Sequence, residues 1–458
     1  MLFNSLAFAF FLPIVFMLYW SFSKSKLKIQ NLLLLAASYV FYGWWDWRFL
    51  SLIMVSTIVD YFVGLIISQS DIKLQRKVFL IISIVFNLGL LGFFKYFNFF
   101  ISSWVELLTS IGYQVQGTST LNIILPVGIS FYTFQTMSYT IDVYRKKLIP
   151  TKDFISFAAF VSFFPQLVAG PIERASHLLP QILKRRKFDT KVAIVGVHLI
   201  VWGMFKKVAV ADNLAMIVDS YYGNIELYSG NTIYTIIVLI FYSFQIYCDF
   251  SGYSDIAIGT SKLFGISLSE NFRRPYFSSS FSEFWQRWHI SLSSWLKDYL
   301  YIPLGGNRKG KLNTYKNNML TMLLGGLWHG ASFNFIIWGG LQGVFLIIQR
   351  VIGKNKILLN RVVIFILITM AWIPFRALTL SDTVMVFKSL ASFNFSMNFP
   401  VGLFKLVLAL VMVLLLLSID ILEELKIRTK NWYISTFLLL LLLLFGNWHS
   451  NSFIYFQF

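Results

Sequence analysis

Long apolar runs recur from one end of the chain to the other, and short clusters of lysine and arginine separate them. A run of about 20 apolar residues is long enough to cross a bilayer as a helix. Of the 458 residues, 57% are hydrophobic and 13% are charged, whereas soluble domains carry about 25% charged residues. The pattern therefore predicts a single all-α polytopic membrane domain over residues 1–458, in place of the two or three soluble domains that length alone suggests.

We expect about 11 transmembrane helices from these runs. One of them is interrupted by Pro126 and Gly128. The segment Ile155–Pro171 is apolar but short, and basic loops flank it on both sides, so we expect a re-entrant segment there. The predicted spans are Leu2–Trp20, Ile29–Trp44, Phe49–Ile67, Val78–Phe94, Asn122–Val143, Val192–Phe205, Thr232–Tyr247, Phe335–Gln349, Val362–Pro374, Leu403–Leu422 and Trp432–Phe445.

The formal net charge of +19 is concentrated in the gaps between the apolar runs. Basic loops are typical of the cytoplasmic side of a membrane protein, so we do not expect nucleic-acid binding. The pattern predicts a multi-pass protein of the inner (cytoplasmic) membrane with both termini on the extracytoplasmic side. Basic residues follow the first apolar run, which favours a retained helix over a signal peptide. The basic loops are Lys24–Lys28, Lys73–Lys77, Arg145–Lys152 and Lys184–Lys191.

Between Phe272 and Lys316, basic residues alternate with aromatic ones and no span of about 20 apolar residues fits. Four large apolar residues there follow the helical spacing i, i+4, i+8 and i+11. We therefore expect an amphipathic interfacial helix over Phe281–Leu300, ended by Pro303–Gly306. The four residues are Phe284, Trp288, Leu292 and Trp295.

Several classes of catalytic site lack their signatures in this sequence. The patterns HExxH, GxSxG, GxxxxGK[ST] and GxGxxG do not occur. The single cysteine, Cys248, rules out an intrachain disulfide and a cysteine-cluster metal site, and we expect no metal. Its neighbours in QIYCDFSGYSD include no histidine or lysine to activate a thiolate, which argues against a covalent role.

Two of the five histidines stand beside tryptophan in short aromatic or glycine-rich segments. His329 lies in LLGGLWHGASFNF, which contains no charged residue, and burial favours a neutral imidazole. A neutral imidazole can accept a proton from an attacking hydroxyl and later return it. Gly325, Gly326 and Gly330 would let a substrate or a backbone segment come close. The alternative is a hydrogen-bonded histidine between packed helices.

His289 lies in FWQRWH, on or beside the expected interfacial helix and near Arg287 and Asp298 in the sequence. It is a candidate for orienting a substrate, stabilising an oxyanion or supporting His329. The alternative is an interfacial anchor, a common place for aromatic side chains. The other three histidines are expected to be structural, and they are His177, His198 and His449.

The charged residues near the expected cytoplasmic side have both a functional and a structural interpretation. Asp249 and Asp255 would be costly at membrane depth and are expected to pair or to line a cavity. Arg273 or Arg274 are candidate partners that would shape a cytoplasmic mouth, and a purely structural role is the alternative. The basic region Arg273–Lys316 would attract an anionic thioester or an acidic carrier protein, or it is ordinary positive-inside charge.

Four segments together carry a resemblance to a known family. They are FPQLVAGPIER (Phe164–Arg174), YCDFSGYSDIAIG (Tyr247–Gly259), NFRRPYFSSSFSEFWQRWHISLSSWLKDYLYIPLGGNR (Asn271–Arg308) and LGGLWHGASFNFIIWG (Leu324–Gly339). They resemble the membrane-bound O-acyltransferases, above all the bacterial alginate O-acetyltransferases and peptidoglycan O-acetylases. The D-alanyl transferases of teichoic acid are the nearest sister group. The tail FIYFQF (Phe453–Phe458) is similar to the alginate type.

This resemblance implies many helices around a thin centre, where funnels from the two sides meet at a catalytic histidine. It assigns that role to His329 and a second catalytic role to His289. It implies acyl transfer from a cytoplasmic acyl-CoA or acyl-carrier thioester to a hydroxyl outside, with no permanently bound cofactor. It also implies an extracytoplasmic SGNH-hydrolase-like partner that passes an acetyl group to a polysaccharide. The candidate substrate-binding residues are Trp285, Arg287, Trp288, Asp298, Trp328 and Asn334.

Three other functions stay open at this point. D-alanyl transfer differs only in the acyl group. A transporter of lipid-linked sugar would place ionisable residues on several spans and would show an internal repeat, and we find neither. A scaffold for an envelope assembly would need no histidine for its function.

Overall fold

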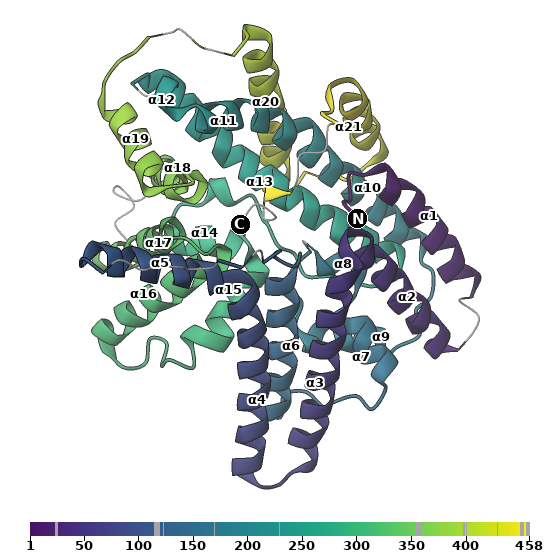
Figure 1. Ribbon diagram of the computed structural model, residues 1–458. Coiled ribbons are helices and arrows are strands. Elements are labelled where there is room, and N and C mark those ends of the chain that lie inside the picture. Colours follow the sequence, from purple (N-terminus) through teal and green to yellow (C-terminus); the bar gives the residue numbers. More distant parts are fainter. Residues whose placement is uncertain are drawn as a thin grey trace. The chain divides into compact units, whose positions relative to one another are not determined.

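A computed structural model describes most of the chain, and every regular element within it is a helix (Figure 1). The all-α prediction is therefore confirmed. Lys24, Asn122, His449 and the last four residues of the FIYFQF tail lie outside the described residues. The described residues are 1–22, 26–113, 120–121, 123–168, 170–228, 230–353, 360–396, 399, 401–427, 429–448 and 453–454.

Contacts divide the chain into two compact units, and we describe each by itself. The prediction of a single domain stays a prediction. The first unit contains Met1–Ala193 and Ser261–Leu268. Its helices are α1 (Leu6–Ser21), α2 (Leu27–Asp46), α3 (Leu50–Gln69), α4 (Lys73–Leu91), α5 (Phe97–Ser110), α6 (Ile129–Tyr144), α7 (Phe154–Val161), α8 (Phe164–Leu167) and α9 (Ala175–Ile182).

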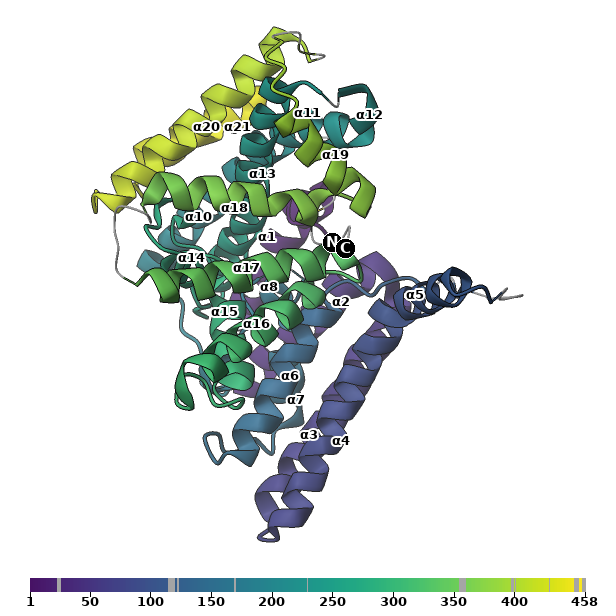
Figure 2. The same ribbon diagram turned by 90° about the vertical axis from the view of Figure 1, so that its left-hand side faces the viewer.

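A polar network joins α3, α4 and α6 inside the first unit. Figures 1 and 2 show α3 and α4 as a long pair, and α6 packs against both. The fully buried Asp60 carboxylate accepts hydrogen bonds from Ser83 Oγ at 2.6 Å and from Asn87 Nδ2 at 2.8 Å. Thr136 of α6 donates to Asn87 Oδ1 at 3.3 Å. These bonds offset the cost of burying polar groups among apolar helices.

The second unit contains Ile194–Thr260 and Ser269–Phe458 and carries both candidate catalytic histidines. Short π-helical turns follow α10, at Phe205–Ala211, and α15, at Lys297–Tyr301. Two helices, α10 (Thr190–Met204) and α13 (Thr232–Leu263), run through both units. The other helices are α11 (Asp212–Gly223), α12 (Ile225–Tyr228), α14 (Phe281–Arg287), α15 (Ile290–Leu296), α16 (Gly310–His329), α17 (Phe333–Ile352), α18 (Arg361–Arg376), α19 (Leu380–Ala391), α20 (Leu403–Glu424) and α21 (Trp432–Phe445).

Backbone contact between α16 and α17 sets the position of His329. The two helices run side by side, and α18 packs on the other side of α17 (Figure 2). A Cβ atom on Gly339 of α17 would lie 2.3 Å from the carbonyl oxygen of Met322 on α16. A Cβ atom on Gly326 of α16 would lie 2.2 Å from the carbonyl oxygen of Phe335. Only glycine allows this approach, so the contact fixes α16 three residues before its terminal histidine.

Nine helical stretches of the described residues have the apolar composition of membrane-spanning helices. Six are long enough to cross, and three are shorter. The expected number of about 11 crossings stays a prediction, because a single stretch such as Leu27–Gln69 contains both α2 and α3. The six are Leu27–Gln69, Lys73–Ser110, Thr190–Gly223, Thr232–Leu263, Phe333–Ile352 and Leu403–Glu424; the shorter three are Leu6–Ser21, Phe154–Leu167 and Trp432–Phe445.

Four predicted boundaries were wrong by more than a turn: the starts of α1, α4 and α6 and the end of α13. α13 continues through YCDFSGYSDIAIG to Leu263, where the prediction ended at Tyr247. It continues because its small residues pack on α10: a Cβ atom on Gly252 would lie 2.7 Å from the carbonyl oxygen of Gly203. α6 begins only at Ile129, after the predicted interruption at Pro126 and Gly128. Helices α5, α9, α11, α12, α16 and α19 were not predicted.

The predicted interfacial helix over Phe281–Leu300 was also wrong, because the backbone breaks in its middle. α14 ends at Arg287, and His289 takes a left-handed conformation with φ 41° and ψ 54°. The segment before α14 holds this break: Asn271 O accepts from Ile290 N at 2.8 Å, and Arg273 N donates to Arg287 O at 2.8 Å. These bonds replace intrahelical ones. The four residues on the predicted apolar face are nevertheless all buried.

The α16–α17 contact predicts different outcomes for two neighbouring glycines. Gly339→Ala should lower the free energy of unfolding by about 1–3 kcal/mol, because the methyl group overlaps the Met322 carbonyl oxygen. Gly340→Ala is the matched control, since its Cβ would meet only Leu323 Cδ2 at 3.6 Å. It should leave stability unchanged or raise it by about 0.5–1 kcal/mol. Thermal unfolding of both variants in detergent measures this, and equal effects would contradict the proposed contact.

Candidate active site

His329 is the last residue of α16, and the chain turns to an extended conformation at Gly330. Its side chain is buried, with 3% of the residue exposed. The imidazole packs edge-on against Trp338 of α17 and Phe375 of α18, with ring centroids 5.0 and 5.3 Å away. The C-terminal end of a helix carries partial negative charge, which favours positive charge on a side chain there. The imidazole is therefore held between aromatic rings at the C-terminal end of a helix.

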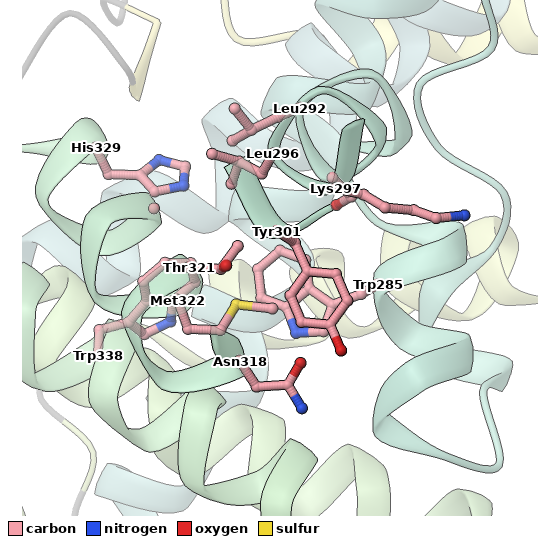
Figure 3. Close-up of a pocket in the computed structure, with 12 residues that line it drawn as sticks. Trp285, Leu292, Leu296, Lys297, Tyr301, Asn318, Thr321, Met322, His329 and Trp338 are labelled. Atoms are coloured by element: carbon pink, nitrogen blue, oxygen red, sulfur yellow. The ribbon is translucent and has the colours of Figure 1, made fainter. Parts of the chain in front are cut away.

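A cavity of about 130 Å³ opens beside His329 (Figure 3). One wall comes from α16 and α17, and the other comes from α14, α15 and the π-helical turn Lys297–Tyr301. Gly325 lines it without a side chain, and a Cβ atom there would lie 3.2 Å from Leu296 Cδ1. The lining residues are Trp285, Leu292, Ser293, Leu296, Lys297, Tyr301, Asn318, Thr321, Met322, Gly325, His329 and Trp338.

Polar atoms gather on the side of the cavity opposite His329. Figure 3 shows Trp285, Tyr301 and Asn318 grouped there, with the Lys297 side chain extending away from them. Trp285 Nε1, Tyr301 Oη and Asn318 Nδ2 are buried, and none has a hydrogen-bond partner within the described part of the chain. An unpaired buried polar group costs about 1–3 kcal/mol. With Trp338 Nε1, four such atoms belong to residues that line this cavity, which makes it a candidate ligand site.

His289 lies near His329 but does not line the cavity, and the centroids of the two imidazole rings are 6.5 Å apart. His289 is fully buried and packs edge-on against Phe250 of α13 at 4.6 Å. Burial lowers the pKa of His289 to about 3, so its imidazole is neutral near pH 7. Its Nδ1 is 3.1 Å from Asn271 Oδ1. The structure thus brings together the two histidines that the sequence singled out.

Two of the six predicted substrate-binding residues lie at this site. Trp285 lines the cavity. Trp328 is buried beside both histidines, with its ring centroid 5.0 Å from that of His329 and 6.0 Å from that of His289. Their assignment to substrate binding stays a prediction, which this geometry supports.

The other four do not line the cavity. Arg287 Nη2 forms ion pairs with Glu283 at 2.8 Å and with Glu424 at 3.1 Å. Asn334 donates to the carbonyl oxygen of Ala377 at 2.8 Å. Trp288 packs in the aromatic core, and Asp298 is partly exposed on the turn after α15. These contacts account for Arg287, Trp288 and Asn334 as structural residues, and a substrate role for the four stays a prediction.

The predicted partners of the two α13 carboxylates were wrong. Asp249 pairs with Lys207 at 2.5 Å, and Asp255 pairs with Lys206 at 2.5 Å. The π-helical turn after α10 carries both lysines and presents them to α13. Arg273 pairs instead with Glu270, and Arg274 pairs with the α20 residues Glu423 and Glu424. The charges therefore join helices and do not form the predicted mouth.

Three cavity residues of α16, Asn318, Thr321 and Met322, went unnoticed in the sequence, because α16 was not predicted as a helix. Its cavity residues follow the spacing i, i+3, i+4, i+7 and i+11, which puts them on one face. Reading Gly310–His329 as a helix would have found this face. The five residues are Asn318, Thr321, Met322, Gly325 and His329.

The remaining candidates have structural contacts. His198 Nδ1 is 2.6 Å from Ser435 Oγ, and its ring packs on Trp432. His177 Nδ1 is 2.7 Å from Glu173 Oε2, and the pair raises the pKa of His177. Cys248 is buried. Across the described residues, no cluster of three or more histidine, cysteine, aspartate or glutamate side chains is arranged to hold a metal ion.

Comparison with known proteins identifies the family. Residues 145–358, which include both histidines, match the family model for MBOAT, the membrane-bound O-acyltransferase family. The chain is 44% identical over 401 residues to the probable alginate O-acetylase AlgI of Pseudomonas aeruginosa, and the match covers 86% of this chain and 75% of the relative. It is 38% identical over 432 residues to the peptidoglycan O-acetyltransferase of Helicobacter pylori, covering 86% and 80%.

A more distant relative is the teichoic acid D-alanyltransferase of Streptococcus thermophilus, at 28% identity over 57% of this chain and 66% of the relative. The chain belongs to the membrane-bound O-acyltransferase family. It is therefore a multi-pass membrane protein and an acyltransferase, as the sequence predicted.

The neutral, buried His289 predicts a specific pH dependence of stability. An unfolded chain protonates this residue near pH 6.5, whereas the folded chain does so only near pH 3. Between these values the unfolded state binds the extra proton, so acid lowers stability by about 1.4 kcal/mol per pH unit. Unfolding in detergent at pH 7.5 and pH 5 should show a smaller acid-induced loss for His289→Gln than for wild type. An identical loss in both proteins would contradict the neutral state of His289.

Proposed function

We propose that an acyl thioester and a hydroxyl acceptor meet in the cavity beside His329, and that the chain O-acetylates an alginate-like exopolysaccharide or a cell-wall polymer. One observation carries the proposal: a buried imidazole faces a cavity whose opposite side presents polar atoms that have no protein partner within the described residues. A base on one side and binding groups on the other are what acyl transfer requires.

In the proposed reaction His329 acts as the general base. The hydroxyl oxygen of the acceptor attacks the thioester carbonyl carbon while the imidazole takes the hydroxyl proton. The new C–O bond forms, the C–S bond breaks, and the imidazolium returns the proton to the departing thiolate. The products are an ester and a free thiol. Burial among Trp338, Phe375 and Trp328 keeps water away from the thioester.

The polar side of the cavity suits the arm of an acyl-CoA or acyl-carrier thioester. That arm contains amide groups, and the indole N–H of Trp285 and the amide N–H of Asn318 are donors for their carbonyl oxygens. Lys297 lines the cavity and is exposed, so its charge can attract the phosphate of the donor. The donor is a substrate, and no permanently bound cofactor is part of the proposal.

The proposal places the donor on the cytoplasmic side and the acceptor outside. The basic loops support this direction, because they favour the cytoplasmic face, and they are in keeping with an inner-membrane location. Segments between the described helices are short, which leaves the polymer to a separate polypeptide. The proposed partners are the lipid bilayer, the thioester donor and an extracytoplasmic SGNH-hydrolase-like acyltransferase.

Acetyl is the acyl group that the comparisons favour. The relatives at 44% and 38% identity are named for O-acetylation, whereas the 28% relative is named for D-alanyl transfer. A cavity of about 130 Å³ suits a short acyl group. D-alanyl transfer to teichoic acid is the second candidate, since that relative aligns over more than half of this chain.

Replacing His329 with glutamine tests this function. In the chain's own host, His329→Gln should reduce ester-linked acyl groups by about 10²- to 10⁴-fold, because it removes the general base. Mild alkali releases acetate and D-alanine from exopolysaccharide, peptidoglycan and teichoic-acid fractions, and mass spectrometry of each fraction identifies the group and the polymer.

His198→Gln is the matched control. This histidine is also buried in the second unit, but it contacts Ser435 and Trp432 instead of the cavity. It should keep acylation within a few-fold of wild type at equal membrane abundance. Full acylation by His329→Gln at wild-type abundance would overturn the proposed role of His329.

A further inference from the structure

Asn271 lies before α14 and contacts His289 through its side chain. Both residues are buried, at 1% and 0% exposed. Asn271 Oδ1 is 3.1 Å from His289 Nδ1, and it also accepts from Ser291 N at 3.2 Å and from Ser291 Oγ at 2.8 Å. On its other side, Asn271 Nδ2 donates to Ser254 Oγ of α13 at 3.0 Å. The amide is thus bonded through both its oxygen and its nitrogen.

These partners fix which way the amide faces. A backbone N–H can only donate, so the atom that faces Ser291 N must be the amide oxygen. Because the same oxygen faces His289 Nδ1, that nitrogen must carry the hydrogen. In a neutral imidazole one nitrogen is a donor and the other is an acceptor. Nε2 of His289 is then the acceptor.

We propose that Asn271 is a positioning residue that holds His289 in the Nδ1–H tautomer and presents its Nε2 as a hydrogen-bond acceptor to the reacting groups. This proposal rests on the proposed function for its role in acyl transfer. It decides between the roles open to His289: a neutral ring with an acceptor at Nε2 does not donate to an oxyanion, and it instead accepts a hydrogen bond from a hydroxyl, a water or His329.

The geometry of the two rings agrees with such a role. Their centroids are 6.5 Å apart, and a single oxygen atom that makes two hydrogen bonds of about 2.8 Å fits between nitrogens of rings at this separation. The left-handed backbone at His289 supports the same conclusion. A non-glycine residue in that conformation is uncommon and is often found at functional sites. Asn271 O accepts from Ile290 N and so helps to hold this turn.

A tautomer measurement tests the proposal without relying on activity. The chain has five histidines, so nitrogen-15 labelling of histidine in the full-length protein in detergent gives few signals, and His289→Gln identifies those of His289. The wild-type spectrum should show a protonated Nδ1 and an unprotonated Nε2. A protonated Nε2 in the wild-type protein would overturn the proposal, whatever the variants do.

Two substitutions then separate positioning from packing. Asn271→Leu removes the acceptor and should lose the fixed tautomer, with acylation reduced by about 10²-fold or more. Asn271→Asp keeps an acceptor for Nδ1–H, and Ser254 can donate to it, so the tautomer and most of the activity should return. If Asn271→Leu folds and keeps the Nδ1–H signal, the proposal is wrong. If the tautomer is as proposed but His329→Gln remains active, the proposed function fails and the positioning of His289 stands.

Asn213 supplies a matched control for packing. It is buried in α11 and donates to the carbonyl oxygens of Ala209 and Phe445. Asn213→Leu should lower thermal stability as Asn271→Leu does, while leaving the His289 signals in place. A shift of the His289 tautomer in Asn213→Leu would show that general loosening, and not Asn271, controls the ring.

Discussion

The close contact of α16 with α17 is the interaction on which the site depends. His329 ends α16, and its ring lies against Trp338 of α17 and Phe375 of α18. That arrangement is possible only where the backbones touch, because a Cβ atom on Gly326 or Gly339 would overlap a carbonyl oxygen of the facing helix. Van der Waals packing of small residues is the main attraction between helices in lipid. The same contact therefore stabilises the unit and places the imidazole.

Buried charged groups in the helix interior are paired, whereas several buried neutral polar atoms, both there and at the cavity, have no hydrogen-bond partner among the described residues. In the helix interior, Asp60 is bonded to serine and asparagine, and Lys207 is paired with Asp212 and Asp249. Such pairing offsets the cost of burying a charge among apolar helices. At the cavity, Trp285, Tyr301 and Asn318 present polar atoms that have no partner among the described residues. These three groups are the candidate hydrogen-bond partners for a substrate in the proposed reaction.

The sequence predicted the helical class and the positions of most apolar helices, because length and hydrophobicity decide membrane insertion. It also singled out His289 and His329, and flanking motifs gave the family. It did not predict α16, whose first half is polar and whose glycines obscure the helical pattern. It did not predict the break at His289 either, since bonds from the distant Asn271 and Arg273 backbone impose it. The lysine partners of Asp249 and Asp255 were not predicted either. They lie on a π-helical turn, which no local sequence pattern indicates.

The central claim is that the thioester enters the cavity beside His329, and the most direct measurement is a cryo-electron microscopy map of the full chain with a non-hydrolysable acetyl-CoA analogue. The account predicts density for the acetyl group next to His329 and for the arm of the analogue beside Trp285, Tyr301 and Asn318. Density for the analogue elsewhere on the chain, with this cavity empty at saturating concentration, would contradict it.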